Sequence, residues 1–185
     1  MKNVLCMALF SMSALLFSCN GAKQDESKAA PVDSVAAVPP KPQPAEFADP
    51  KYIEMGKSQL TALSAGDVDK WLSNFADNAV YQWNGGDSLS GKAAISAYWK
   101  KRRGDVIDSI SFSDEIWLPI KVNQPQSLEQ PGVWLLGWYR VSAKYKNGHK
   151  MSQFIHSDAH FNADDKIDRY IQYIDRSLIN AALKK

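Results

Sequence analysis

The chain has 185 residues, of which 45% are hydrophobic and six are tryptophan. This length and composition predict one domain with a hydrophobic core, together with extensions outside it. The 22 basic and 20 acidic residues leave a formal net charge of +2, which excludes an overall electrostatic field that would attract nucleic acid. A partner must therefore be recognised by a local site.

The first 18 residues have the pattern of a secretory signal peptide. Lys2 is followed by an apolar stretch over residues 4–17. At 1.5 Å per residue, about 14 residues are too few to cross a hydrocarbon core of about 30 Å. We therefore expect residues 1–18 to be a signal peptide rather than a transmembrane helix.

Cys19 follows the apolar stretch, and Leu16, Ser18 and Cys19 resemble the lipobox of bacterial lipoproteins. This resemblance implies cleavage between Ser18 and Cys19 and attachment of lipid to the Cys19 thiol, while Cys6 leaves with the signal peptide. The lipid would hold the protein on a membrane of the bacterial cell envelope, facing the periplasm or the cell surface. The alternative is an ordinary secretory signal followed by an incidental cysteine.

Residues 19–48 are rich in proline, alanine and small polar residues. A segment of this composition buries too little apolar surface to offset the entropy of ordering. We expect it to be a disordered tether that begins at the lipidated Cys19. The folded domain is then expected over residues 49–185.

Helical patterns come first in this domain. Asp49 and Pro50 are suited to start a helix whose apolar face runs to about residue 65. Gly66 is expected to end it, Asp67 to cap a short second helix, and Ser90 to cap a third.

Strand patterns dominate the rest of the domain. Alternating and aromatic-rich runs predict strands over residues 78–83, 106–122, 133–145, 149–162 and 167–175. Three helices followed by strands that return through short turns predict an α+β domain. The three N-terminal helices would pack against a strongly curved antiparallel sheet.

Two segments resemble NTF2-like domains of the SnoaL-like kind. The first, over residues 65–104, has a Gly-Asp pair, a Phe-x-x-Asn-Ala-Val run and a glycine before a helix with Ala-Ile. The second, HFNADDKIDRYIQYID over residues 160–175, resembles the last hairpin of that family. The resemblance implies a cone with a pocket between sheet and helices, in a fold that enzymes and non-enzymes share. Asp165 stands where the family commonly has glycine, so the turn has a different geometry or Asp165 adopts a positive φ.

His156, Asp158 and His160 alternate along one predicted strand and therefore share one face of it. If that face lines the pocket, His156 and Asp158 can act as a general acid-base pair. If Phe161 faces the core instead, as the resemblance suggests, all three residues lie on the outer face. The fourth ligand of a metal site is not identifiable, so we expect no metal.

Asp175 ends the last predicted strand and matches the Tyr-x-Asp of the family. Its parity with Ile167, Ile171 and Tyr173 predicts that it faces inward. There it can be a base, or it can accept a hydrogen bond from a tyrosine or tryptophan side chain.

Aromatic residues are the other candidates for the pocket. Most of them are expected to fill the core, and a few at the mouth of the cone can stack on a ligand. The candidate ligand-binding residues are Tyr81, Trp83, Trp99, Trp138 and Tyr173.

Two functional hypotheses follow. The first is a membrane-anchored binding domain, without cofactor, that holds a small hydrophobic or aromatic ligand or a protein partner. The second is an enzyme of the SnoaL or ketosteroid-isomerase type that uses Asp175 or the pair of His156 and Asp158. The outer face of the sheet is also expected to form a homodimer.

Overall fold

The computed structural model describes residues 41–126 and 130–184. Its helices are α1 (Lys51–Ala65), α2 (Val68–Trp71), α3 (Lys92–Lys101) and α4 (Arg176–Leu183). The predicted signal peptide, the lipidation at Cys19 and the tether up to residue 40 lie outside the described residues. Within the part that the structure describes, no helix combines the length and apolar character needed to cross a membrane.

Seven strands form a single sheet in the order β1-β4-β5-β6-β7-β2-β3. All neighbouring strands pair antiparallel except β2 and β7, which are parallel. The strands are β1 (Ala45–Phe47), β2 (Phe75–Trp83), β3 (Ser88–Ser90), β4 (Ile107–Val122), β5 (Gly132–Tyr145), β6 (Lys150–Phe161) and β7 (Ile167–Tyr173).

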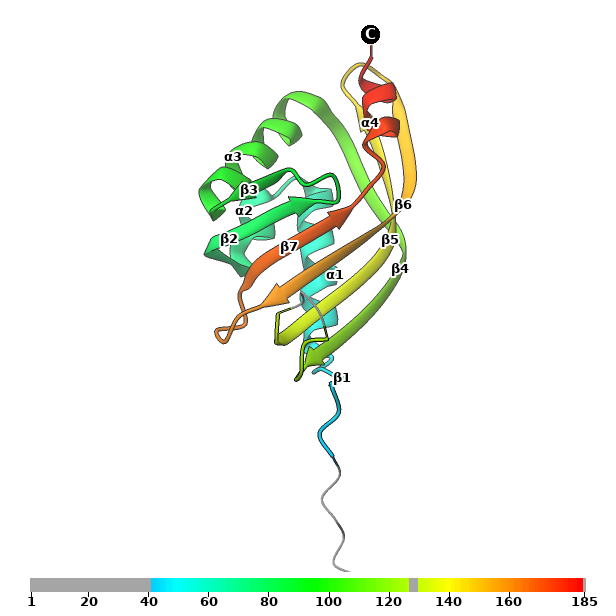
Figure 1. Ribbon diagram of the computed structural model, residues 1–185. Helices are drawn as coiled ribbons and strands as arrows, with labels where there is room; N and C mark the ends of the chain where they lie inside the picture. Colours follow the sequence, from blue (N-terminus) through cyan, green and yellow to red (C-terminus); the bar gives the residue numbers. More distant parts are fainter. Residues whose placement is uncertain (1–40, 127–129, 185) are drawn as a thin grey trace, which may run out of the picture. The chain divides into compact units, whose positions relative to one another are not determined.

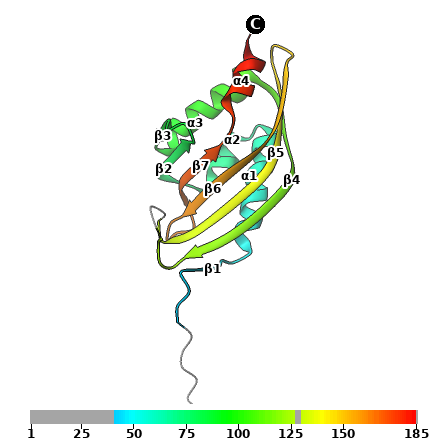
Figure 2. The ribbon, with the colours of Figure 1, turned by 45° about the vertical axis from the view of Figure 1, so that its right-hand side comes forward.

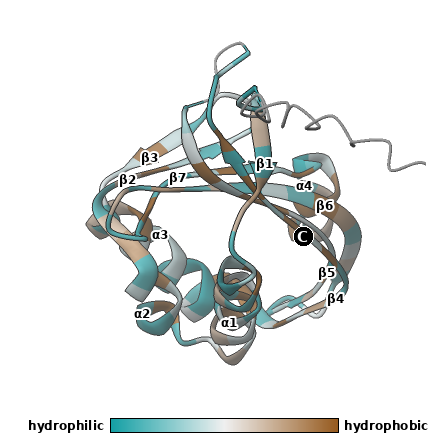
Figure 3. Cartoon of the chain, turned by 90° about the horizontal axis from the view of Figure 1, so that it is seen from below, coloured by the Kyte–Doolittle hydropathy of each residue, from teal (hydrophilic) through white to brown (hydrophobic). Residues whose placement is uncertain are grey.

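The sheet curls, with α1, α2 and α3 on its concave side (Figures 1 and 2). Irregularities in the pairing help to bend it, since the register of β4 and β5 shifts between Ser113 and Ile116 and Asp114 adopts a φ of 56° there. Seen from below, the sheet and these helices surround a common interior (Figure 3). The predicted α+β arrangement of three N-terminal helices on a curved sheet is confirmed, but the sheet is not wholly antiparallel as predicted, because β2 and β7 pair in parallel.

Two glycines allow α1 to approach the sheet closely. Trp117 of β4 lies between Gly56 of α1 and Gly137 of β5. A Cβ atom at Gly56 would lie 2.9 Å from the Trp117 ring, and one at Gly137 would lie 2.5 Å from it. The indole fills the space that the missing side chains leave, which is how α1 reaches the core.

Local signals for helix ends are largely confirmed. Gly66 ends α1 with a φ of 81°, and the Asp67 side chain accepts a hydrogen bond from the Lys70 backbone and so caps α2. Asp165 adopts a φ of 55°, one of the two geometries expected for its turn. Its carboxylate accepts hydrogen bonds from Lys51 Nζ, at 2.6 Å, and from the Tyr52 hydroxyl.

Other details differ from expectation. Gly91 rather than Ser90 precedes α3, because Ser90 pairs with β2 as the end of β3. Residues 45–47, within the expected tether, form β1 against β4. The short helix α4 was not predicted, and it lies beside β6 at the end of the domain opposite β1 (Figure 1).

Candidate ligand-binding site

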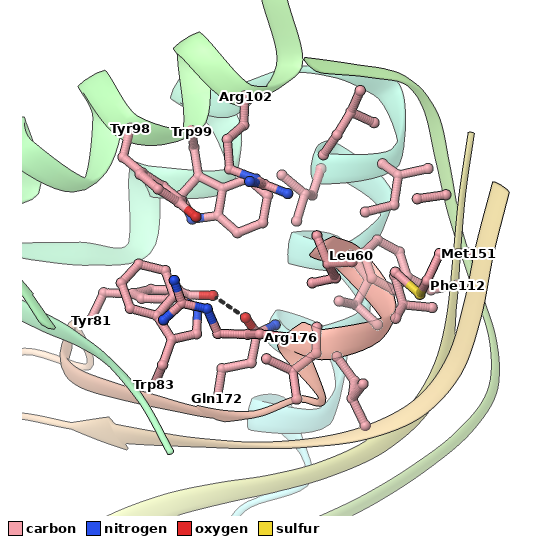
Figure 4. Close-up of a pocket in the computed structure, with 18 of the residues that line it drawn as sticks. Leu60, Tyr81, Trp83, Tyr98, Trp99, Arg102, Phe112, Met151, Gln172 and Arg176 are labelled. Atoms are coloured by element: carbon pink, nitrogen blue, oxygen red, sulfur yellow. Dashed lines mark hydrogen bonds between the residues drawn. The ribbon is translucent and has the colours of Figure 1, made fainter. Parts of the chain in front are cut away.

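A largely apolar cavity of about 100 Å³ lies on the concave side of the sheet, between it, α3 and α4 (Figure 4). Aromatic side chains form much of its wall, with aliphatic residues from α1, β4 and β5 behind them. The aromatic lining consists of Trp71, Tyr81, Trp83, Tyr98, Trp99, Phe112, Tyr139, Tyr145 and Tyr170.

The aromatic wall is positioned by β2 and α3. Tyr81 and Trp83 share one face of β2 because residues two apart on a strand point the same way. The Tyr81 ring stacks on Tyr170, with centroids 5.1 Å apart, and meets Trp83 edge-on at 4.8 Å. Trp99 of α3 closes the opposite side (Figure 4). The structure therefore places three of the five predicted ligand-binding residues around this cavity.

Polar groups inside the wall are paired with one another. The Tyr81 hydroxyl donates a hydrogen bond of 2.7 Å to Gln172 Oε1. The Tyr139 hydroxyl lies 3.1 Å from both Ser157 Oγ and the Tyr170 hydroxyl. Burial raises the pKa of Tyr81 and of Tyr139 well above the ordinary tyrosine range. Both side chains are therefore neutral hydrogen-bonding groups at physiological pH.

The rim of the cavity is basic. Arg102, at the C-terminal end of α3, lies over the Tyr98 ring at 5.7 Å, and Arg176, at the start of α4, lies over the Trp83 ring at 5.6 Å. Arg176 also forms an ion pair with Asp87. Of the described residues that line the cavity, none is an aspartate, glutamate, histidine, lysine or cysteine.

The outer face of β6 carries His156, Asp158 and His160. Of the two alternatives considered from the sequence, this is the one in which they do not line the pocket. Ile155, Ser157, Ala159 and Phe161 are buried on the inner face, and Phe161 packs against the Tyr52 ring at 4.6 Å. The hypothesis that the imidazoles face the cone is therefore wrong.

The first of these histidines belongs to an aromatic stack on the outer face. His156 Nε2 lies 2.6 Å from Asp158 Oδ1. The His156 ring stacks on Trp138 at 4.5 Å and on Tyr173 at 5.3 Å. Trp138 and Tyr173, both predicted to bind a ligand in the cone, are thus on the wrong side of the sheet for that role. Burial raises the pKa of Asp158 despite the neighbouring imidazole.

His160 belongs to a separate pair. Its Nδ1 lies 2.6 Å from Asp168 Oδ1 and its Nε2 lies 3.0 Å from the Pro131 carbonyl oxygen. Within the described residues, no group of three or more histidine, cysteine, aspartate or glutamate side chains is placed to hold a metal ion.

The inward orientation predicted for Asp175 is also wrong. Asp175 precedes α4, and its carboxylate accepts a hydrogen bond of 2.8 Å from the Ser177 backbone. Hydrogen bonds from the Ser177 side chain and then from its backbone lower the pKa of Asp175, as expected for a helix cap in solvent. An aspartate directly before a run with Leu178, Ile179 and Leu183 is a helix-start signal, which could have revealed α4 from the sequence.

The cause of the error is a bulge in β7. Ile167 pairs with Phe161 and Tyr170 with Ala159, so both face inward although they are three residues apart. The extra residue near Asp168 inverts all later positions. Gln172 consequently faces the cavity while Tyr173 faces outward. The sequence analysis missed Gln172 because of this bulge. It missed Arg102 and Arg176 because no local sequence pattern places them at the same cavity.

Comparison with known proteins supports the fold. Residues 57–115 match the SnoaL-like domain family. Among curated proteins, none matches the chain in sequence. An NTF2-like protein from Burkholderia xenovorans LB400 superposes with a TM-score of 0.55 at 16% identity, covering 75% of this chain and all (100%) of that one.

Two further solved structures have similar folds. An NTF2-like protein from Burkholderia pseudomallei K96243 gives a TM-score of 0.56 at 11% identity, covering 72% of this chain and 97% of that chain. An LEH-like epoxide hydrolase from M. tuberculosis gives 0.51 at 15% identity, covering 71% and 87%. At these identities the similarity concerns architecture alone. The described domain has the NTF2-like fold, with a SnoaL-like segment over residues 57–115.

Proposed function

We propose that this protein is a non-catalytic binding protein that holds a small, largely apolar molecule in the cavity of its NTF2-like domain. The observation that carries the proposal is the chemistry of the cavity wall. The described lining offers aromatic faces, aliphatic side chains, amides and guanidinium groups. These groups bind and orient a molecule, whereas burial holds the Tyr81 and Tyr139 hydroxyls in their neutral form.

The alternative is an enzyme of the SnoaL or ketosteroid-isomerase type. The M. tuberculosis protein of similar fold is named an epoxide hydrolase, so this architecture does accommodate catalysis. General acid-base chemistry requires a proton acceptor within hydrogen-bonding reach of the substrate. Asp175 caps α4, and His156 and Asp158 lie behind the sheet. Their positions weigh against the enzyme hypothesis in the form that names these residues.

Binding in the cavity can be tested by filling it. Ala143 lines the cavity from β5 and is buried, so Ala143→Leu places a larger apolar side chain in the space. Ala94→Leu on the exposed face of α3 is the matched control. The probes are 3-methylbutanoate, 3-methylbutan-1-ol and benzene, and the binding of each is measured by ligand-observed NMR.

We expect at least one probe to bind the wild type and the Ala94→Leu variant, and none to bind Ala143→Leu. Thermal unfolding of each variant verifies that it is folded. Absence of binding to the wild type, or equal binding to the filled variant, would overturn the proposal.

We further propose that the protein is anchored to a membrane of the cell envelope, with the domain facing the periplasm or the cell surface. Support comes from the apolar stretch over residues 4–17 and the lipobox-like sequence that ends at Cys19. The proline-rich segment after Cys19 would separate the domain from the lipid.

A homodimer through the outer face of the sheet is the arrangement that we propose for the assembled protein. Ile116, Phe154 and Tyr173 are 57%, 48% and 43% exposed on the described domain, and Trp138 lies among them. Exposed apolar side chains at this density favour a self-complementary interface. Analytical sedimentation of the wild type and of Ile116→Lys tests this proposal. We expect the wild type to be a dimer and Ile116→Lys to be a monomer. A monomeric wild type would contradict the proposal.

A further inference from the structure

Arg102 lines the cavity, and no carboxylate among the described residues forms an ion pair with it. It is half-buried at the C-terminal end of α3, and its described contact is with the Tyr98 ring. Some basic residues of the described domain do pair with acids, for example Arg140 with Asp114 and Lys144 with Asp108. A partly desolvated guanidinium without a counter-ion favours an anion from solution.

The Trp99 indole lies beside it with an unused donor. Trp99 is 7% exposed, and its Nε1 atom is buried without a hydrogen-bond partner among the described residues. A buried donor of this kind is costly unless something accepts its hydrogen bond. In Figure 4, Trp99 and Arg102 extend from α3 toward the same space. The Trp99 Nε1 atom is not exposed to the cavity, so the indole must shift before an acceptor group of a ligand can reach it.

The cavity is polar at one end and apolar at the other. Arg102 and Arg176 lie at the rim, together with the exposed Asn180. Leu60, Ile110 and Val141 belong to the buried, apolar remainder of the wall. A molecule with an apolar body and one anionic end matches this gradient.

The volume restricts the size of the apolar body. The cavity has a volume of about 100 Å³. It is smaller than a dry protein cavity of about 150 Å³ that is known to bind benzene. A short acyl chain fits a space of this size. A polycyclic body, which needs a pocket of several hundred Å³ (~300 or more), does not fit.

We propose that the ligand is a small carboxylic acid, bound with its apolar part inside the cavity and its carboxylate at the rim between Arg102 and the Trp99 indole. This inference rests on the proposed binding function and specifies the chemical class of its ligand. Arg102 neutralises the carboxylate and the indole N–H of Trp99 donates to it, whereas the charge of Arg176 is already paired with Asp87.

The test compares an acid with its neutral counterpart. Wild type is titrated calorimetrically with 3-methylbutanoate and with 3-methylbutan-1-ol, which share the same branched chain. We expect the acid to bind at least about ten-fold more tightly, as a charge-assisted hydrogen bond provides. Arg102→Met should lower acid affinity about ten-fold and leave the alcohol unchanged. Arg140→Met, on the outer face, should change neither.

Trp99→Phe keeps an aromatic ring, although a smaller one, and removes the indole donor, so it should lower acid affinity about three-fold more than it lowers alcohol affinity. Equal affinity of wild type for acid and alcohol would overturn the anionic ligand while leaving the binding function intact. Equal losses in Arg102→Met and Arg140→Met would overturn the role of Arg102, since surface charge would then explain them. If neither probe bound, and benzene did not bind either, the proposed function itself would fail.

Discussion

The Tyr81 hydroxyl and Gln172 Oε1 are joined by a hydrogen bond of 2.7 Å inside the cavity, across two parallel strands, although the two residues are 91 positions apart in sequence. Figure 4 shows this bond beneath Trp99, on the wall formed by β2 and β7. It fixes the orientation of the amide, and it leaves Gln172 Nε2 as the end of that side chain available to a ligand.

Removing the Tyr81 hydroxyl leaves a buried acceptor without a partner. Tyr81→Phe should therefore lower the free energy of unfolding by about 1–2 kcal/mol, measured by urea denaturation. Tyr145→Phe is the control, because Tyr145 is equally buried but has no described hydroxyl hydrogen bond. Equal losses in the two variants would show that the bond to Gln172 contributes nothing specific.

Close packing around Trp117 leaves no space for a side chain at Gly137. A Cβ atom there lies 2.5 Å from the indole ring, so Gly137→Ala should destabilise the domain by about 1–3 kcal/mol through overpacking. Gly85→Ala meets no atom within 4 Å and should leave the thermal midpoint nearly unchanged. A Gly137→Ala protein as stable as wild type would mean that Trp117 has room to move.

Asp165 should make stability depend on pH. Hydrogen bonds from Lys51 and then Tyr52 lower the pKa of its carboxyl below the ordinary value. A carboxyl whose pKa is depressed by folding stabilises the native state above its unfolded pKa of about 3.9, and this contribution disappears as pH falls through the folded pKa.

Asp165→Asn tests this dependence, since asparagine also tolerates a positive φ. The variant should unfold at lower urea concentration than wild type at pH 7, and the two should converge near pH 2 or lower. Asp164→Asn, in the same exposed turn, is the control. A gap between Asp165→Asn and wild type that persists at the lowest pH would assign the effect to something other than the charge.

Asp175 should stabilise the start of α4 as a helix cap and should not act as a base. Asp175→Ala removes the acceptor for the Ser177 backbone and should speed amide hydrogen exchange over residues 178–183 roughly five-fold. Asp175→Asn preserves an acceptor and should preserve protection. If both variants frayed α4 equally, the carboxylate charge rather than the cap geometry would be responsible.

Lipidation should depend on one of the two cysteines. Cells fed an alkyne-tagged fatty acid should label the wild type and Cys6→Ser, because residue 6 lies in the predicted signal peptide. Cys19→Ser should lose the label and the partition into detergent. Labelling of Cys19→Ser would refute attachment at Cys19.

Features that depend on neighbours in sequence were predictable. Gly66 ends a helix and Asp67 caps the next one because each conformation depends on a few adjacent atoms. The positive φ of Asp165 is one of the two geometries that the sequence left open. Alternation along β6 likewise predicted which residues share a face. It could not decide which face is inner, and the burial of Phe161 in the core decides that.

What the sequence alone determined is therefore the order of the first three helices and the long strands, several of their ends and the aromatic character of the interior. Tertiary structure decided the site. The bulge near Asp168 exchanged Asp175 for Gln172 at the cavity, because one extra residue inverts a two-residue alternation. Arg102 and Arg176 line the same cavity only because the curled sheet brings segments far apart in the sequence around one interior. No periodicity in the chain records that closure, since it arises from packing between distant segments.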